Sequence, residues 1–298
     1  MNHSLKAFSV AALAAALTAC GGGSSSSDDD STGSMSLDVT DAPTDQFAEV
    51  VIEFTGLTLQ PADGEAIEFT FDEPKTLDLL TLQGGETAPL LENEEVPAGE
   101  YSWIRLTLNV DNSYVTETGG AEKTLFIPSG AETGLKLVSG FTVAQGGSSS
   151  FTIDFDARKS IVDPQGAVAD YFLRPALRLV NNLEVGSIAG TVDESTVIQT
   201  ECADSSQYTG MVYVYEGSDA TPDDLGSANE PLVAVPVAYD EESTTYSFKA
   251  AFLLEGDYTA SYSCDTDDNE ADEELTFVGT QNVAVVADSE ATANFPAE

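Results

Sequence analysis

The sequence predicts an all-β protein made of two antiparallel β-sandwich domains in tandem. Three observations predict this fold class. Short stretches from Leu37 onward alternate apolar and polar residues with a period of two. Gly, Pro, Asn and Asp separate these stretches at near-regular spacing, which is typical of the turns between strands. The hydrophobic fraction of 42% is enough for packed cores, although the formal net charge is −42.

The chain begins with a predicted signal peptide, residues 1–19. Lys6 supplies a positive charge, and the apolar run over residues 7–17 is too short to cross a bilayer. The run ends in Leu17-Thr18-Ala19-Cys20, which resembles the bacterial lipoprotein signal. This resemblance implies cleavage before Cys20 and acylation of its sulfur, with palmitate among the acyl chains. Gly21, where an Asp would favour the inner membrane, implies the outer membrane. The alternative is an ordinary cleaved signal followed by a chance cysteine.

A flexible linker is predicted for residues 20–36, from the lipidated cysteine onward. Residues 21–36 read GGGSSSSDDDSTGSMS and offer almost no apolar side chain to bury. Such Gly/Ser-rich and acidic chains are typical of hydrated spacers. The linker would hold the folded part away from the membrane, and whether that part faces the periplasm or the cell exterior stays open.

The first predicted domain covers residues 37–185. Its clearest strands are residues 50–54, 67–71 and 104–110, and the best helical candidate is short, residues 76–82. The second predicted domain, residues 186–298, has the size of an immunoglobulin- or prealbumin-like module. Its predicted strands are residues 187–192, 211–215, 232–237, 246–254, 258–264, 275–278 with 283–286, and 291–295.

The same short pattern precedes one strand in each predicted domain: Gly99-Glu100-Tyr101 and Gly256-Asp257-Tyr258. Glycine can adopt a positive φ at a tight turn, and the tyrosine ring can pack into the core. This step resembles one in carboxypeptidase-regulatory and prealbumin-like β-sandwich modules. We therefore expect the second domain to be a module of that kind.

Four stretches of the first domain are distinctive as a set: LDVTDAP at residues 37–43, VPAGEY at 96–101 with IRL at 104–106, FTIDFDARKSI at 151–161, and LRPALR at 173–178. Together they resemble a family of bacterial lipoproteins, domain of unknown function 4382, over residues 36–185. The resemblance implies a β-rich envelope domain and assigns no catalytic residue.

The composition argues against several functional classes. The chain has 52 Asp+Glu against 10 Lys+Arg, which argues against nucleic acid and anionic membrane surfaces as direct partners. The single His is His3, inside the predicted signal peptide, so the mature chain would lack histidine for a catalytic triad or a metal ligand. We therefore expect no enzyme. A hydrolase with paired carboxylates is the remaining catalytic alternative.

Cys202 and Cys264 are the only cysteines after Cys20. In an oxidising compartment, two cysteines in one small domain are expected to form a structural disulfide. A redox or nucleophilic role would need a neighbouring base or a CxxC spacing, and the sequence has neither.

Two charged segments are candidate binding sites. Residues 265–274 partly resemble a calcium loop, with Asp265, Asp267, Asn269 and Asp272 as candidate ligands, but Glu270 and Thr276 replace the Gly and Glu that an EF-hand requires. The alternative is a solvated hairpin tip. Arg158, Arg174 and Arg178 are candidates for an anion site, or else for ion pairs with nearby Asp residues.

Trp103 shares strand parity with Arg105, opposite to Ile104 and Leu106. The ring is expected either to cover a sheet edge or to stack on a sugar.

The function predicted from the sequence is therefore a non-catalytic, lipid-anchored cell-envelope protein with a binding or structural role. An adhesin-like protein that binds a glycan or calcium is the main alternative. The expected partners are the membrane, through the lipid, and a glycan or envelope protein. No cofactor other than calcium is indicated, and the oligomeric state stays open.

Overall fold

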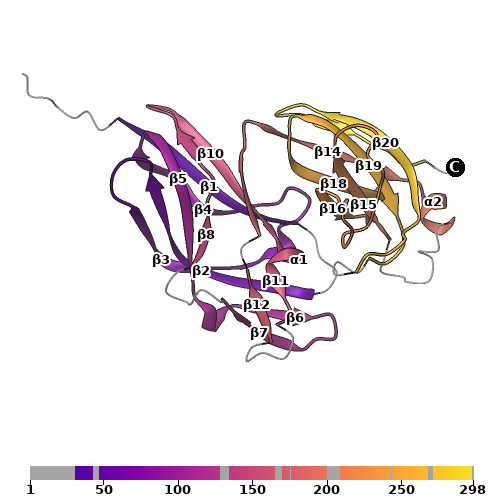
Figure 1. The fold of residues 1–298 in the computed structure, drawn as a ribbon, viewed down its shortest axis with the longest axis horizontal. Helices are drawn as coiled ribbons and strands as arrows, with labels where there is room; N and C mark the ends of the chain where they lie inside the picture. Colours follow the sequence, from indigo (N-terminus) through magenta and orange to yellow (C-terminus); the bar gives the residue numbers. More distant parts are fainter. Residues whose placement is uncertain are drawn as a thin grey trace, which may run out of the picture. The chain divides into compact units, whose positions relative to one another are not determined.

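The computed structural model describes residues 31–42, 47–127, 134–164, 170–174, 176–199, 209–241, 243–267 and 271–296. The predicted signal peptide and Cys20 lie outside these residues. Almost all of the regular structure in the described part is β-strand (Figure 1), which confirms the all-β class. The remaining elements are short: η1 (Leu79–Thr81), η2 (Val110–Asn112), α1 (Ala157–Ser160) and α2 (Glu194–Gln199).

The first sandwich consists of two sheets. The smaller sheet has the order β13 (Leu177–Asn181), β10 (Ser148–Asp156), β1 (Thr32–Ala42) and β4 (Ala88–Pro97). The larger sheet has the order β11 (Ile161–Val162), β12 (Tyr171–Leu173), β7 (Glu122–Phe126), β6 (Tyr114–Glu117), β2 (Phe47–Pro61), β5 (Gly99–Leu108) and β8 (Leu135–Leu137), with β3 (Ile67–Asp78) beside β2 and β9 (Phe141–Val143) beside β5.

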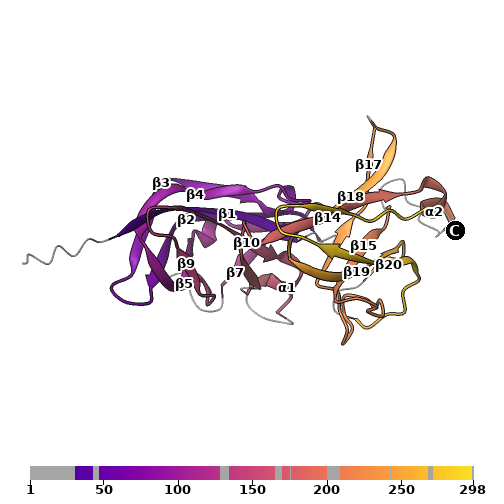
Figure 2. The ribbon, with the colours of Figure 1, turned by 90° about the horizontal axis from the view of Figure 1, so that it is seen from above.

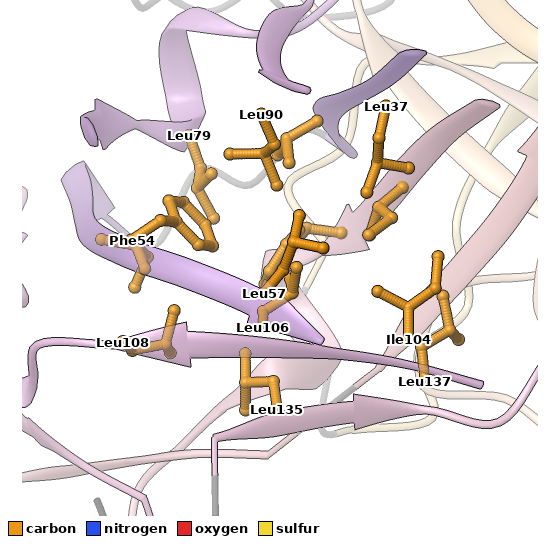
Figure 3. Close-up of a cluster of buried hydrophobic side chains, with 14 of the residues drawn as sticks. Leu37, Phe54, Leu57, Leu79, Leu90, Ile104, Leu106, Leu108, Leu135 and Leu137 are labelled. Atoms are coloured by element: carbon orange, nitrogen blue, oxygen red, sulfur yellow. The ribbon is translucent and has the colours of Figure 1, made fainter. Parts of the chain in front are cut away.

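Most strand pairs are antiparallel, as predicted, but β1–β10 and β7–β12 are parallel, and so is the pairing of residues 187–189 with 290–292 in the second sandwich. Figure 3 shows how the two sheets meet: Leu37 and Leu90 of the smaller sheet face Leu57, Leu106 and other side chains of the larger one. Leu37, Leu57 and Leu106 are almost completely buried. Alternation along each strand sends one side chain inward and the next outward, so the period of two in the sequence builds this core.

The structure corrects two predictions in this region. Thr32–Ser36 was assigned to the flexible linker, but it forms the start of β1, and Met35 is fully buried. Met35 has the same parity as Leu37 and Val39, so it extends their core-facing row despite the Gly/Ser-rich composition. Residues 76–82 do not form an α-helix: β3 pairs with β2 as far as Asp78, and only the 3-10 turn η1 follows.

The second sandwich also consists of two sheets, seen as two layers in Figure 2. One has the order β17 (Ala238–Asp240), β18 (Thr245–Leu254), β14 (Val185–Val192) and β21 (Glu290–Thr292). The other has the order β16 (Val233–Pro236), β15 (Met211–Glu216), β19 (Gly256–Ser263) and β20 (Phe277–Val285). The predicted strands are found here, with residues 275–278 and 283–286 contributing to the single strand β20.

The two Gly-acid-Tyr steps form the same contact. Tyr101 donates a hydrogen bond to the carbonyl of Pro97, and Tyr258 donates one to the carbonyl of Leu254, at 2.7 and 2.8 Å. Both tyrosines are buried, at 3% and 4% exposure. Each hydroxyl therefore ties the start of a core strand to the chain that precedes it, as a tyrosine corner does.

Candidate functional site

Two acidic loops meet over the outer face of one sheet of the second sandwich, where Leu225 packs with Tyr213 and Tyr215 of β15. The first, here the Asp224 loop, is residues 217–232 and joins β15 to β16. The second, here the Asp267 loop, is residues 264–276 and joins β19 to β20; residues 268–270 lie outside the described part. β15 and β19 are antiparallel neighbours, so the two loops leave opposite ends of the sheet and meet across its face.

The Asp224 loop is fixed by hydrogen bonds within itself. The hydroxyl of Tyr215, a buried side chain of β15, accepts from the Asp223 backbone N–H at 2.9 Å and donates to the Asp223 carbonyl. Ser227 Oγ donates to the Asp224 carbonyl at 2.9 Å, and Asn229 Nδ2 donates to the Thr221 carbonyl at 2.8 Å. These bonds hold the Asp223 and Asp224 backbone against the Tyr215 side chain.

The two loops are joined by their own carboxylates. Asp224 Oδ2 accepts from the Glu273 backbone N–H at 2.9 Å, and Asp267 Oδ2 accepts from the Leu225 backbone N–H at 3.2 Å. Gly226 allows this close approach, since a Cβ there would lie 1.9 Å from the Ala271 carbonyl oxygen. Each loop therefore supplies an acceptor to the other.

Three carboxylates converge where the loops meet. Asp223, Asp224 and Asp272 each offer one oxygen, and these oxygens lie within 4.8 Å of one another. Asp224 is fully buried, and its Oδ1 has no hydrogen-bond partner among the residues that the structure describes. Like charges this close repel, and a buried acceptor without a partner is costly, so the arrangement is suited to a bound cation. Carboxylate oxygens are the ligands that calcium prefers.

Asp267 lies beside this group of three. Its side chain is 8% exposed, and its Oδ2 also accepts from the Tyr213 hydroxyl at 2.9 Å. Its Oδ1 is buried without a partner in the described part of the chain. Burial raises the pKa of Asp267, and the charges of Asp224 and Glu273 raise it further, while the hydrogen bonds from Tyr213 and Leu225 lower it. A cation nearby would stabilise the ionised form of Asp267 and so lower its pKa.

The predicted calcium ligands are partly gathered here. Asp272 belongs to the group of three, and Asp267 lies next to it. Asp265 is engaged elsewhere, because its Oδ2 accepts from the Thr276 backbone N–H at 2.5 Å. Asn269 lies outside the described residues. Sequence analysis missed Asp223 and Asp224, because two acidic residues in a polar loop carry no distinguishing signal among 52.

The three predicted anion-site arginines do not form one open site. Arg158 pairs with Asp156 at 3.2 Å and Arg178 with Asp154 at 2.6 Å, so both make the ion pairs that were the alternative. The Arg158 side chain is only 3% exposed. Arg174 lies over the Phe172 ring, at 6.0 Å from its centroid.

The predicted disulfide stays a prediction. Cys264 follows β19 and is buried at 6% exposure, with its neighbours in the core of the second sandwich. Cys202 lies outside the described residues.

Comparison with known proteins agrees with the resemblance of the first sandwich. A family model described as a domain of unknown function (DUF4382) matches residues 32–175. No curated protein matches this sequence. Among the described residues, no helix is long and apolar enough to cross a membrane.

Two pilins are among the solved structures that resemble parts of this chain. The minor pilin GBS52 of Streptococcus agalactiae is 10% identical, with 88% of this chain and 94% of that chain covered and a TM-score of 0.21. The major pilin subunit BcpA of Bacillus cereus is 10% identical, with 89% and 69% covered and a TM-score of 0.22. Residues 32–175 thus match the model of a domain family described as of unknown function.

Proposed function

We propose that this protein is a non-catalytic, lipid-anchored protein of the bacterial cell envelope that binds a divalent cation, calcium, between the Asp224 and Asp267 loops. The observation that carries the cation site is the buried Oδ1 of Asp224, which has no partner among the described residues and lies beside the carboxylates of Asp223 and Asp272. A cation there would satisfy that oxygen and offset the repulsion among three carboxylates. The anchor rests on the resemblance of residues 17–20 to the lipoprotein signal.

Calcium is favoured over magnesium by the ligand set. The three carboxylates come from two separate loops, and the exposed Asp272 can adjust its position. Calcium accepts six to eight oxygens in flexible geometry, whereas magnesium requires a near-ideal octahedron. The bound ion would lock the two loops together and present them as one rigid surface.

Calcium titration of the full chain, followed by calorimetry and by thermal melting, tests the cation site. We expect saturable binding and a rise in melting temperature that sodium chloride at equal ionic strength does not reproduce. Asp224→Asn, which keeps the shape but removes the charge, should abolish both. Asp257→Asn is the matched control, since Asp257 is exposed and lies outside the carboxylate group. Equal responses of the two variants would overturn the site.

Detergent-phase partitioning tests the anchor. Cys20→Ala should move the protein from the detergent phase to the aqueous phase, because no other anchor is proposed and multiple acyl chains bind membranes firmly. Retention of the variant in the detergent phase would contradict lipid anchoring at Cys20.

A further inference from the structure

A cationic patch lies on the outer face of the larger sheet of the first sandwich. It consists of Trp103 and Arg105 on β5 and Lys136 on β8, and is here called the Trp103 patch. The alternate residues Ile104 and Leu106 are fully buried, so the patch residues point away from the core. Lys136 is exposed, and Trp103 and Arg105 are half-buried.

The two cations of the patch are direct neighbours. Arg105 and Lys136 are opposite each other in the β5–β8 register, a position in which like charges repel. Five other basic side chains of the described residues form salt bridges with carboxylates: Lys123, Arg158, Lys159, Arg178 and Lys249. Of the remaining two, Lys75 donates to the Pro89 carbonyl and Arg174 lies over the Phe172 ring. Within that same part of the chain, Arg105 and Lys136 have no such partner, in a protein with 52 acidic residues. An external anion would supply the missing charge.

The Trp103 ring organises both cations. The Arg105 guanidinium carbon lies 4.9 Å from the ring centroid and the Lys136 ammonium lies 4.4 Å from it. Arg105 Nε is buried and has no hydrogen-bond partner in the described structure. The two terminal nitrogens of the guanidinium are not buried in this way. The guanidinium is therefore held by the ring with its terminal nitrogens toward solvent. Such an edge is suited to two parallel hydrogen bonds with a carboxylate.

We propose that the Trp103 patch binds the carboxylate of a uronic acid within an acidic polysaccharide. The carboxylate would meet Arg105 and Lys136, and the apolar ring C–H groups of the sugar would lie against the exposed part of the indole. Gln60 is opposite Trp103 and Thr58 is opposite Arg105 on β2, so polar side chains for sugar hydroxyls adjoin the patch. One carboxylate per sugar spaces the negative charges, which limits repulsion from the acidic protein.

Intrinsic fluorescence tests the proposal directly, because Trp103 is the only tryptophan in the chain. The full chain is titrated with a short oligogalacturonate in a chelator-containing buffer, so that the result does not depend on the cation site. The matched ligand is the same oligosaccharide with its carboxylates methyl-esterified. We expect a saturable change in Trp103 emission with the acidic ligand, and little or none with the ester. Loss of one charge-assisted contact should weaken binding about tenfold or more.

The double variant Arg105→Gln/Lys136→Gln retains the fluorescent reporter and should lose binding. Lys123→Gln is the control, since it removes a cation of the same sheet that is already paired with Glu117. Urea unfolding of each variant checks the fold. Equal binding of acid and ester, equal binding by the double variant, or equally strong binding of a Glu-rich peptide or acetate would each overturn the assignment. So would the absence of any fluorescence change at saturating oligogalacturonate.

Discussion

Asp224 and Asp267 hold each other's loops through reciprocal hydrogen bonds. Asp224 accepts a backbone N–H from Glu273 in the Asp267 loop, and Asp267 accepts one from Leu225 in the Asp224 loop. Each of the two carboxylates also keeps one oxygen buried without a hydrogen-bond partner in the described structure. Backbone N–H groups therefore hold the two loops together through hydrogen bonds to these carboxylates. The remaining negative charge of the carboxylates is one that a cation would offset.

The calcium response is expected to depend on pH through Asp267. Its pKa is raised above the ordinary value of 3.8, first by burial and then by neighbouring carboxylates. As the pH falls through that raised pKa, Asp267 takes up a proton and attracts the cation less. The melting-temperature rise caused by calcium should therefore shrink on acidification before ordinary carboxylates titrate.

Without calcium, ionisation of Asp267 is expected to lower the stability of the protein as the pH rises. A carboxyl group whose folded pKa is raised contributes stability that is fully present below its unfolded pKa, near 3.8, and is lost as the pH rises through the folded pKa. Melting curves across a pH series, with and without calcium, measure both slopes. Asp267→Asn should remove the part of each slope that comes from this residue, and identical slopes in the variant would show that another group titrates.

Gly226→Ala is expected to weaken the contact between the two loops without removing a carboxylate. The new Cβ would lie 1.9 Å from the Ala271 carbonyl oxygen, so the two loops must move apart. The calcium-induced stabilisation should fall, because Asp223 and Asp224 would no longer meet Asp272 at the same distances. Gly119→Ala is the control, since its Cβ would meet no atom within 4 Å. Calorimetric calcium binding that is unchanged in Gly226→Ala would contradict this account.

Much of the fold could be predicted because the pattern that specifies a strand is local. The alternation of Ile104 and Leu106 with Trp103 and Arg105 gives both the strand and its core face. The start of β1 was missed because Gly and Ser dominate its composition, and only the parity of Met35 indicates a strand. At Gly33 the glycine serves packing, since a Cβ would lie 2.2 Å from the Ala144 carbonyl oxygen.

The candidate sites depend on contacts that no local pattern specifies. Asp267 and Asp272 could be selected from their spacing, but Asp223 and Asp224 join them only because the two loops meet across the face of the sheet. Likewise, Trp103 and Arg105 could be placed on one face from their parity. Lys136 reaches that face only through the β5–β8 register. Sequence reasoning therefore identified one half of each site, and tertiary pairing supplied the other half.

Asp41→Asn is expected to stabilise the protein at neutral pH. Asp41 is 4% exposed; its Oδ1 accepts from the Ala157 backbone N–H at 3.1 Å, and its Oδ2 is buried without a partner among the described residues. Burial, followed by the charges of Asp154 and Asp156, raises the pKa of Asp41 well above 3.8. Ionised Asp41 therefore opposes folding, and the amide would remove that cost, which is about 1–3 kcal/mol for a buried unsatisfied group.

Urea unfolding at several pH values measures this effect. The gain in Asp41→Asn should be largest at neutral pH and vanish below about pH 3.8, where the wild-type carboxyl is protonated in both the folded and unfolded states. Asp72→Asn, at an exposed position of β3, is the control. A destabilised Asp41→Asn protein at neutral pH would mean that the ionised carboxylate is needed there.

The Cys202–Cys264 disulfide is expected to form in the mature protein. Mass measurement before and after reduction should differ by two hydrogens, and thiol alkylation of the folded, non-reduced protein should label neither cysteine. Reduction should lower the free energy of unfolding by up to about 4 kcal/mol on the chain-entropy estimate. Two alkylated thiols would show that the pair is not bridged.

Tyr101→Phe and Tyr258→Phe are expected to destabilise the protein to a similar extent. Each variant keeps the buried ring and removes one hydroxyl, leaving the carbonyl of Pro97 or Leu254 without that hydrogen bond. The loss should be about 1 kcal/mol per site. Tyr239→Phe is the control, because Tyr239 is 50% exposed.

If each sandwich unfolds separately, each variant should shift only one of two calorimetric transitions. Because the two hydroxyls lie in different cores, the double variant should lose the sum of the single losses. A loss clearly different from the sum would show that the two sandwiches are energetically coupled.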